Sequence, residues 1–199
     1  MARMMPSADL PDVLQAIQLA TRSHQQQHAC NAHTFEDGAG LWQLVQQHQP
    51  RHMLELGTGL GYTACLMALA SPQGQVLTLE GDPEHAALAR QQIAALGLQQ
   101  RVQLHEGSFA TVMQALQLPA GSQDLVFFDG NMPPLILVQH FHTLLAPGGL
   151  LVCANIDLNG PLGARRVRAE LADAQRWQLL PPLESGLTRV ARRLPALSP

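Results

Sequence analysis

The sequence predicts an α/β fold in which seven strands form a doubly wound, mostly parallel sheet within one domain. Five short apolar runs alternate with helical segments between residues 53 and 154, and runs apolar on both faces are typical of parallel strands covered by helices on both sides. Two further strand-like segments are joined by a short glycine turn, which predicts a hairpin and an antiparallel last strand. A length of 199 residues suits one sizeable core, so we expect a single domain over residues 1–199.

The first fifty residues are expected to be helical. Asp9 is expected to cap a helix with Pro11 in its first turn, and apolar residues follow it at one-face spacing. Residues 23–30 are rich in Gln and His without an apolar period, which predicts a loop or a frayed helix. A second helix is expected from about Asp37 to just before Pro50. We expect residues 1–50 to form a lid or dimer contact on a core of residues 51–199.

The core elements follow in regular alternation. The expected strands cover residues 53–56, 76–79, 102–104, 125–128 and 150–154, and the expected helices cover residues 61–70, 83–96, 109–117, 135–145 and 162–175. The hairpin then runs over residues 177–183 and 187–192, around Glu184-Ser185-Gly186. The last strand should therefore be antiparallel to its neighbours.

Composition excludes several classes of function. The chain has 12 basic and 15 acidic residues, a formal net charge of -3, so it lacks the basic excess with which nucleic-acid binders neutralise phosphates. All of the basic residues are Arg and none is Lys. The absence of Lys excludes Schiff-base chemistry, the lysine of a P-loop and an ammonium general base.

The remaining bulk features predict a cytoplasmic protein. Cys30, Cys65 and Cys153 form no C-x-x-C pair, and the latter two lie in apolar runs, as expected of buried, reduced thiols. No apolar run approaches the roughly 20 residues of a membrane-spanning helix, and the N-terminus has no signal-peptide core. We expect no membrane partner.

The most informative motif is a glycine loop, Gly57-Thr58-Gly59-Leu60-Gly61, which follows the first strand and opens a helix. This is the context that a nucleotide-binding loop requires. The spacing is G-x-G-x-G, and Tyr62 stands where a dinucleotide fingerprint would need its third glycine. Glu55 would repel a pyrophosphate but suits an ammonium group, and Glu80, at the end of the next strand, suits ribose hydroxyls. Together they favour S-adenosylmethionine over NAD.

The run from residue 53 to about 160 resembles the class I, Rossmann-like methyltransferases that use S-adenosylmethionine. Within them it is most similar to the catechol and caffeoyl-CoA O-methyltransferase group. The resemblance lies in the order of five segments rather than in any one of them: Leu54-Glu55-Leu56-Gly57, Gly61-Tyr62-Thr63, Leu77-Thr78-Leu79-Glu80-Gly81-Asp82-Pro83, Asp124-Leu125-Val126-Phe127-Phe128-Asp129 and Leu145-Ala146-Pro147-Gly148-Gly149.

The resemblance implies a set of cofactor-binding residues. They would hold the methionine part of S-adenosylmethionine, its ribose and its adenine, and they are His33, Glu55, Gly57, Gly59, Gly61, Tyr62, Thr63, Glu80, Gly81, Gly107, Ser108, Phe109 and Asp129. Many relatives carry Asp where Ser108 stands. Phe109 would either stack on adenine or pack in the core. His33 would belong to an N-terminal segment that closes over the cofactor.

Two parts of the catechol-type chemistry are missing from this chain. Relatives bind a divalent metal through three ligands, and Asp129 and Asn155 match two of them, whereas Ala154 stands at the third. Asp157 would substitute only after loop rearrangement, because Mg²⁺ demands octahedral geometry. The catalytic lysine of the family is replaced by Met132. We therefore expect no metal ligands and no Mg²⁺-dependent mechanism.

What remains still permits methyl transfer, because attack on an activated sulfonium needs mostly positioning. Asp129, at the carboxyl end of a strand, is the expected base or orienter, although it would equally serve as a cap for the following turn. Asn131 and Asn155 would orient a substrate oxygen or act as turn residues, and His28 or His33 is an alternative base.

The sequence predicts a methyltransferase that uses S-adenosylmethionine, acts on an oxygen of a small molecule without a catalytic metal, and forms a homodimer. The first alternative is a pseudoenzyme or interaction module that binds the cofactor without turnover. The second, a nucleotide-dependent oxidoreductase, is disfavoured by the G-x-G-x-G spacing.

Overall fold

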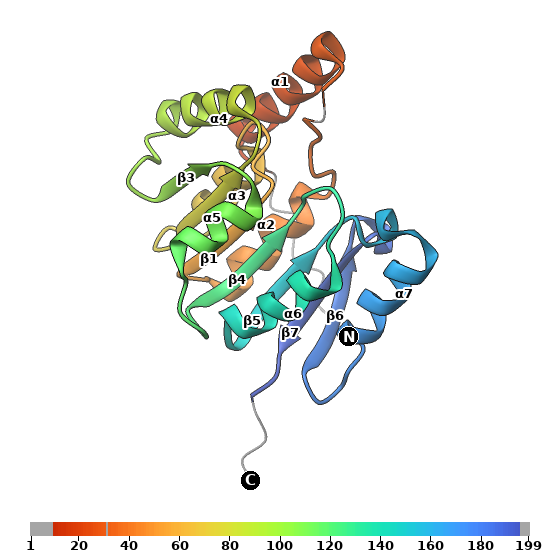
Figure 1. The fold of residues 1–199 in the computed structure, drawn as a ribbon. Coiled ribbons are helices and arrows are strands. Elements are labelled where there is room, and N and C mark those ends of the chain that lie inside the picture. Colours follow the sequence, from red (N-terminus) through yellow and green to blue (C-terminus); the bar gives the residue numbers. More distant parts are fainter. Residues whose placement is uncertain (1–9, 31, 196–199) are drawn as a thin grey trace, which may run out of the picture.

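A computed structural model describes residues 10–30 and 32–195. They form a seven-stranded sheet with helices on both faces (Figure 1). The strands are β1 (His52–Leu56), β2 (Gln75–Glu80), β3 (Val102–Glu106), β4 (Gln123–Phe128), β5 (Leu145–Cys153), β6 (Trp177–Leu183) and β7 (Thr188–Arg193). The α-helices are α1 (Asp12–His28), α2 (Gly38–His48), α3 (Tyr62–Ala70), α4 (Pro83–Ala95), α5 (Phe109–Leu116), α6 (Leu135–Leu144) and α7 (Gly160–Leu171). Single 3₁₀ turns, η1 (Ile156–Asn159) and η2 (Glu184–Gly186), follow β5 and β6.

The strand order is β3-β2-β1-β4-β5-β7-β6, as the alternation of elements predicts for a doubly wound sheet. Strands β1 to β5 pair in parallel, and β7 runs antiparallel to both β5 and β6. The chain moves outward from β1 in one direction through β2 and β3, and in the other through β4 and β5. Ligands of open α/β sheets bind at such a switch point, outside the carboxyl ends of the strands.

The sheet separates two apolar layers because successive side chains of a strand point to opposite faces. Met53 of β1 and Phe127 of β4 pack in the layer under α1 to α4. Leu54 and Phe128, their neighbours in sequence, pack in the layer under α5, α6 and α7. Burial on both faces is the physical reason why consecutive residues such as Met53-Leu54 of β1 and Phe127-Phe128 of β4 are all apolar.

The first helix is longer than the sequence pattern predicts. Residues 23–28 belong to α1, so the expectation of a loop or frayed helix is wrong there, and Ala29, with φ of 50°, ends the helix. The face of α1 that packs against the rest of the protein begins with Leu14 and Ile17. It continues through Thr21 and His24, which are buried although they are polar. Asp9, the expected cap, lies outside the described residues, and Pro11 occupies the N-cap position.

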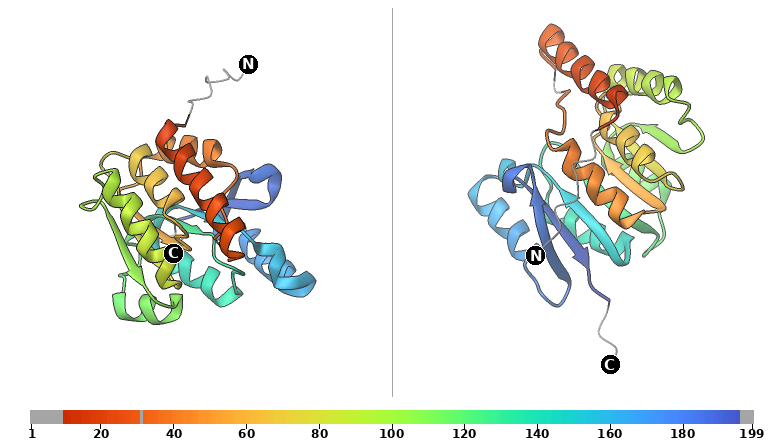
Figure 2. Two further views of the ribbon diagram at one scale, coloured as in Figure 1. Left: turned by 90° about the horizontal axis from the view of Figure 1, so that it is seen from above. Right: turned by 180° about the vertical axis from the view of Figure 1, so that it is seen from behind.

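The second helix matches its prediction. It is capped by Asp37, whose carboxylate accepts a hydrogen bond of 2.9 Å from the Gly40 amide. Figure 2 shows from above and behind that α1 lies across the same end of the domain as α3 and α4. Cys65 and Cys153 are buried free thiols, as predicted, and burial raises the pKa of each to about 12. No helix among the described residues is both long and apolar enough to cross a membrane.

Candidate active site

The first residue of the loop after β1, Gly57, has a backbone conformation that only glycine adopts without strain. Gly57 has φ of 103°, and a Cβ atom placed on it would lie 2.7 Å from the carbonyl oxygen of Asp129. The loop after β1 therefore packs backbone to backbone against the residue that follows β4. The strand registers make this possible, since Leu56 pairs with Leu79 on one side and with Phe128 on the other. Gly57, Glu80 and Asp129 consequently meet at one edge of the sheet.

Glu55 is fully buried behind the glycine loop. Its carboxylate accepts hydrogen bonds from the Thr63 hydroxyl and, at 2.5 Å, from the Thr78 hydroxyl. Burial raises its pKa to about 7, the two threonine bonds oppose this rise, and the charges of Asp129 and Glu80 add to it. Burial makes the ionised form of Glu55 unfavourable, because water no longer solvates its negative charge. A cation placed close to the carboxylate would compensate for this loss and would itself be stabilised. Glu55 thus fits the positively charged ligand that the sequence predicts.

Glu80 ties the glycine loop to the loop after β2. One carboxylate oxygen accepts a hydrogen bond of 2.8 Å from the Gly59 amide, and the other accepts one of 2.9 Å from the Asp82 amide. Each oxygen keeps further acceptor capacity, because an ionised carboxylate has about four lone-pair sites. Glu80 is therefore held in place by the backbone with its remaining lone pairs free for a ligand's hydroxyl groups.

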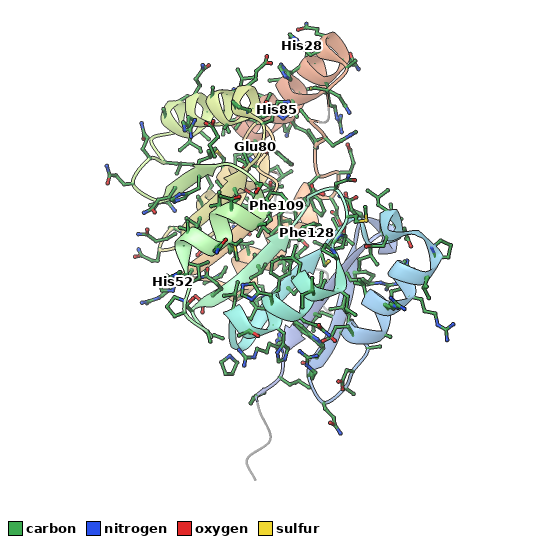
Figure 3. All side chains as sticks on the ribbon, viewed as in Figure 1. His28, His52, Glu80, His85, Phe109 and Phe128 are labelled. Atoms are coloured by element: carbon green, nitrogen blue, oxygen red, sulfur yellow. The ribbon has the colours of Figure 1, made fainter. Side chains whose placement is uncertain are left out.

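The residues predicted on the adenine side cluster at the ends of β2 and β3. A Cβ atom on Gly81 would lie 3.8 Å from the Gly107 carbonyl oxygen, so the two backbones run close together. Ser108 caps α5, since its hydroxyl oxygen accepts a 3.2 Å bond from the Thr111 amide, and the structure thus gives it a helix-capping role. Phe109 is half-buried, with its ring edge-on to Phe128 at a centroid distance of 6.2 Å. Figure 3 shows Phe109 next to Phe128, with both below Glu80 in this view.

Two predicted cofactor residues have structural roles for their side chains. The Tyr62 ring is buried, and its hydroxyl packs so closely on Gly38 of α2 that no Cβ would fit there. The Thr63 hydroxyl is committed to Glu55. What these residues offer a ligand are their backbone amides, which open α3 directly after the loop and lie at the positive end of its dipole.

His33 lies in the segment between α1 and α2. A Cβ atom on Gly59 would come 3.7 Å from the His33 carbonyl oxygen, so this segment does pass over the glycine loop. The imidazole is exposed and bonds to the Gln25 side chain at 2.9 Å. The structure thus brings the His33 backbone, rather than its ring, to the loop.

Asp129 is the acidic residue that directly follows β4. Its pKa is raised to about 7, first by burial and then by the negative charge of Glu184, against a hydrogen bond of 3.0 Å donated by the Asn155 amide nitrogen. That nitrogen also donates to the Gly130 carbonyl at 2.8 Å, so Asn155 fixes both the carboxylate and the turn after it. An acid that titrates near pH 7 is suited to accept a proton.

The donors around Asp129 do not fit a Mg²⁺ ion. Ala154 is buried beside it without a donor side chain, and Asn155 presents an amide nitrogen to the carboxylate. Asp157 is exposed and forms an ion pair with Arg168 at 2.5 Å. One carboxylate and one amide oxygen fall short of the several oxygen ligands that Mg²⁺ takes in octahedral geometry. Met132, at the family's lysine position, is about half exposed.

Glu184 is a residue of the candidate site that the sequence analysis does not predict, because its position in Glu184-Ser185-Gly186 indicates only a hairpin turn. Its carboxylate accepts hydrogen bonds from the Glu36 amide at 3.1 Å and from the Thr188 hydroxyl at 2.5 Å, and its own amide donates to Asp37 at 3.1 Å. It therefore joins the hairpin to the N-terminal segment beside Asp129. No local signal marks this role, since Glu36 and Asp37 lie nearly 150 residues away in the sequence.

The sheet order, the glycine loop and the acids Glu55 and Glu80 together define the class of Rossmann-like, S-adenosylmethionine-dependent methyltransferases. The sequence pattern of the O-methyltransferase family matches residues 4–180. The chain therefore belongs to the O-methyltransferase family.

Individual relatives agree with this assignment. A catechol O-methyltransferase of Niastella koreensis is 36% identical over 150 residues, which make up 67% of each chain. Catechol O-methyltransferase B of Danio rerio is 38% identical over 131 residues, or 63% of this chain and 50% of the relative. These matches span from half to two thirds of the relatives' own length. The crystal structure of an O-methyltransferase from Bacillus cereus in complex with SAH shares the fold with a TM-score of 0.74 at 22% identity, over 94% of this chain and 93% of the other.

Proposed function

We propose that this protein transfers a methyl group from S-adenosylmethionine to an oxygen atom of a small molecule without a catalytic divalent metal. The observation that carries the proposal is the meeting of Gly57, Glu80 and Asp129 at one sheet edge over the buried Glu55. A cationic cofactor, a ribose and an acceptor hydroxyl each find a matching partner in this group.

The chain's own residues would hold the cofactor in a fixed order. Glu55 supplies the field for a cation, Glu80 accepts from the ribose hydroxyls, and the amides at the start of α3 face the carboxylate. The backbones of Gly81 and Gly107, which run close together, would line the adenine. When bound, S-adenosylmethionine supplies an electrophilic methyl group that needs no further activation.

The acceptor side depends on Asp129. Its carboxylate accepts the proton of the acceptor hydroxyl as the new O–C bond forms and the S–C bond breaks. Asn155 keeps the carboxylate in place, and Glu184 keeps its proton affinity high. With no lysine in the chain and no complete Mg²⁺ ligand set around Asp129 among the described residues, the acceptor's own acidity must supply the rest of the driving force for proton transfer. We therefore expect acidic phenols to react faster than ordinary alcohols.

The direct test is transfer of an isotope-labelled methyl group to a series of phenols of graded pKa, with 5 mM Mg²⁺ in one arm and EDTA in the other. The proposal predicts equal rates in both arms and rates that rise with acceptor acidity. Activity that appears only with Mg²⁺ would contradict the metal-free mechanism. Methylation of a nitrogen or sulfur acceptor alone would contradict the choice of oxygen.

We further propose that the protein works in the cytoplasm as a homodimer. The buried reduced thiols Cys65 and Cys153 support a reducing compartment. Exposed apolar side chains on η1 and α7, Leu158 and Leu162, support a contact between copies of the chain. Light scattering on the purified protein tests the dimer, and a monomer at micromolar concentration would contradict it.

A further inference from the structure

A cluster of metal-ligating side chains lies outside the proposed active site, where the end of α1 meets the start of α4. One ligand atom from each of His24, Cys30 and His85 lies within 4.8 Å of the other two. We propose that this His24–Cys30–His85 cluster is a binding site for a zinc-class divalent ion. The site takes its residues from the N-terminal segment and from α4, and it does not depend on the proposed function.

His24 gives the strongest reason to expect a ligand. The residue is about nine-tenths buried, and its Nε2 atom has no hydrogen-bond partner among residues 10–30 and 32–195. A buried polar atom without a partner costs about 1–3 kcal/mol, and native proteins leave few of them. A metal ion bound in the cluster would satisfy this nitrogen, which apolar packing does not.

The ligand types select the metal. Two imidazoles and a thiolate form a soft N₂S set, which suits Zn²⁺ and excludes Mg²⁺ and Ca²⁺. In a tetrahedral zinc site the ligand atoms stand about 3.3–3.6 Å apart, as the usual Zn–N and Zn–S distances require. The ligand atoms now lie within 4.8 Å of one another, so binding an ion would draw them closer together. The fourth position is left for water.

The surroundings are suited to a cation. Asp82 caps α4 directly beside the cluster, and its carboxylate accepts hydrogen bonds from the Glu84 amide at 2.8 Å and from the His85 amide at 3.2 Å. His28 stacks on His24 with ring centroids 4.4 Å apart. Figure 3 shows His28 at the end of α1 and His85 at the start of α4, on the side of Glu80.

A bound ion would fasten two parts of the chain that border the cofactor loop. His85 follows Glu80 by five residues, and Cys30 precedes His33, whose carbonyl passes over Gly59. The ion would therefore hold the N-terminal segment against α4. We expect it to protect the end of α1 from proteolysis.

The experiment uses the full-length protein without a histidine tag, reduced and freed of metal, and titrated with Zn²⁺. We expect one Zn²⁺ per chain with a dissociation constant of about 1 μM or tighter, unaffected by excess Mg²⁺. Cys30→Ala and His85→Gln should each weaken binding roughly tenfold or more. The control His140→Ala removes an exposed imidazole of α6 and should change nothing.

Titration with Co²⁺ keeps the test independent of variants that fail to fold. Wild-type protein should show a thiolate-to-cobalt charge-transfer band, and Cys30→Ala should not. A wild-type Co²⁺ spectrum without this band would overturn the proposal. So would Zn²⁺ binding that survives Cys30→Ala and His85→Gln but is lost in His28→Ala, because that result describes a surface pair of histidines on α1.

Discussion

Replacing Glu55 by Gln should change the stability of the ligand-free protein in opposite directions at low and high pH. The Glu55 carboxyl is fully buried, and its pKa is raised from 4.5 to about 7, chiefly by that burial. The folded state therefore holds the proton more tightly than the unfolded state between these two values. By linkage, the free energy of unfolding falls as the pH rises through this window.

The size of the effect follows from the shift. About 2.5 pKa units at 1.36 kcal/mol each give roughly 3 kcal/mol of ionisation cost above pH 7. Glu55→Gln removes that cost but turns an amide nitrogen toward Thr63 or Thr78, at about 1 kcal/mol for a weakened hydrogen bond. The variant should therefore be more stable than wild type by about 2 kcal/mol at pH 8.5, and less stable by about 1 kcal/mol at pH 4, below the unfolded pKa.

Thermal unfolding measures the difference directly. For a chain of this length, 2 kcal/mol corresponds to roughly 4–8 °C in Tm. The control Glu106→Gln changes an exposed carboxylate that pairs with Arg90, and it should shift Tm little at either pH. If Glu55→Gln lowered Tm equally at pH 4 and pH 8.5, the reasoning that a buried ionised carboxylate destabilises the ligand-free fold would be refuted.

Further substitutions at the same sheet edge give separate tests. Gly57→Ala should cost about 2–4 kcal/mol in urea unfolding, because its Cβ would meet the Asp129 backbone, whereas Gly97→Ala, at φ of 66° with no atom within 4 Å, should cost only about 1 kcal/mol. Asp129→Asn should lower kcat by about 10²–10⁴-fold. A decrease of less than threefold would show that Asp129 is not the base. Glu184→Gln removes a charge that raises the Asp129 pKa, so the acid limb of the pH–rate profile should move to lower pH with the plateau unchanged, and an unmoved limb would contradict this coupling.

The sheet and its helices could be predicted from the sequence because their signals are local. Strands buried on both faces must be apolar throughout, and the glycine turn at residues 184–186 marks the hairpin. The glycine loop and Glu80 could also be predicted from local signals, because the strand, the loop and the helix follow one another within thirty residues.

The rest depended on contacts between distant residues. The buried face of α1 continues through Thr21 and His24, which no apolar period reveals. Glu184 reaches Asp129 only because β7 inserts between β5 and β6. The resemblance assigns Tyr62 and Thr63 to the cofactor, and it gives no sign that the fold uses their hydroxyls for packing and for holding Glu55.

The central claim is that the site at the carboxyl ends of β1, β2 and β4 binds S-adenosylmethionine, and calorimetric titration tests it most directly. Wild-type protein should bind S-adenosylmethionine and S-adenosylhomocysteine at one site per chain and should not bind NAD. Glu80→Gln should weaken both by roughly 10–100-fold, as expected for loss of charge-assisted bonds to the ribose. Binding of NAD alone, or unchanged affinity in Glu80→Gln, would contradict the account.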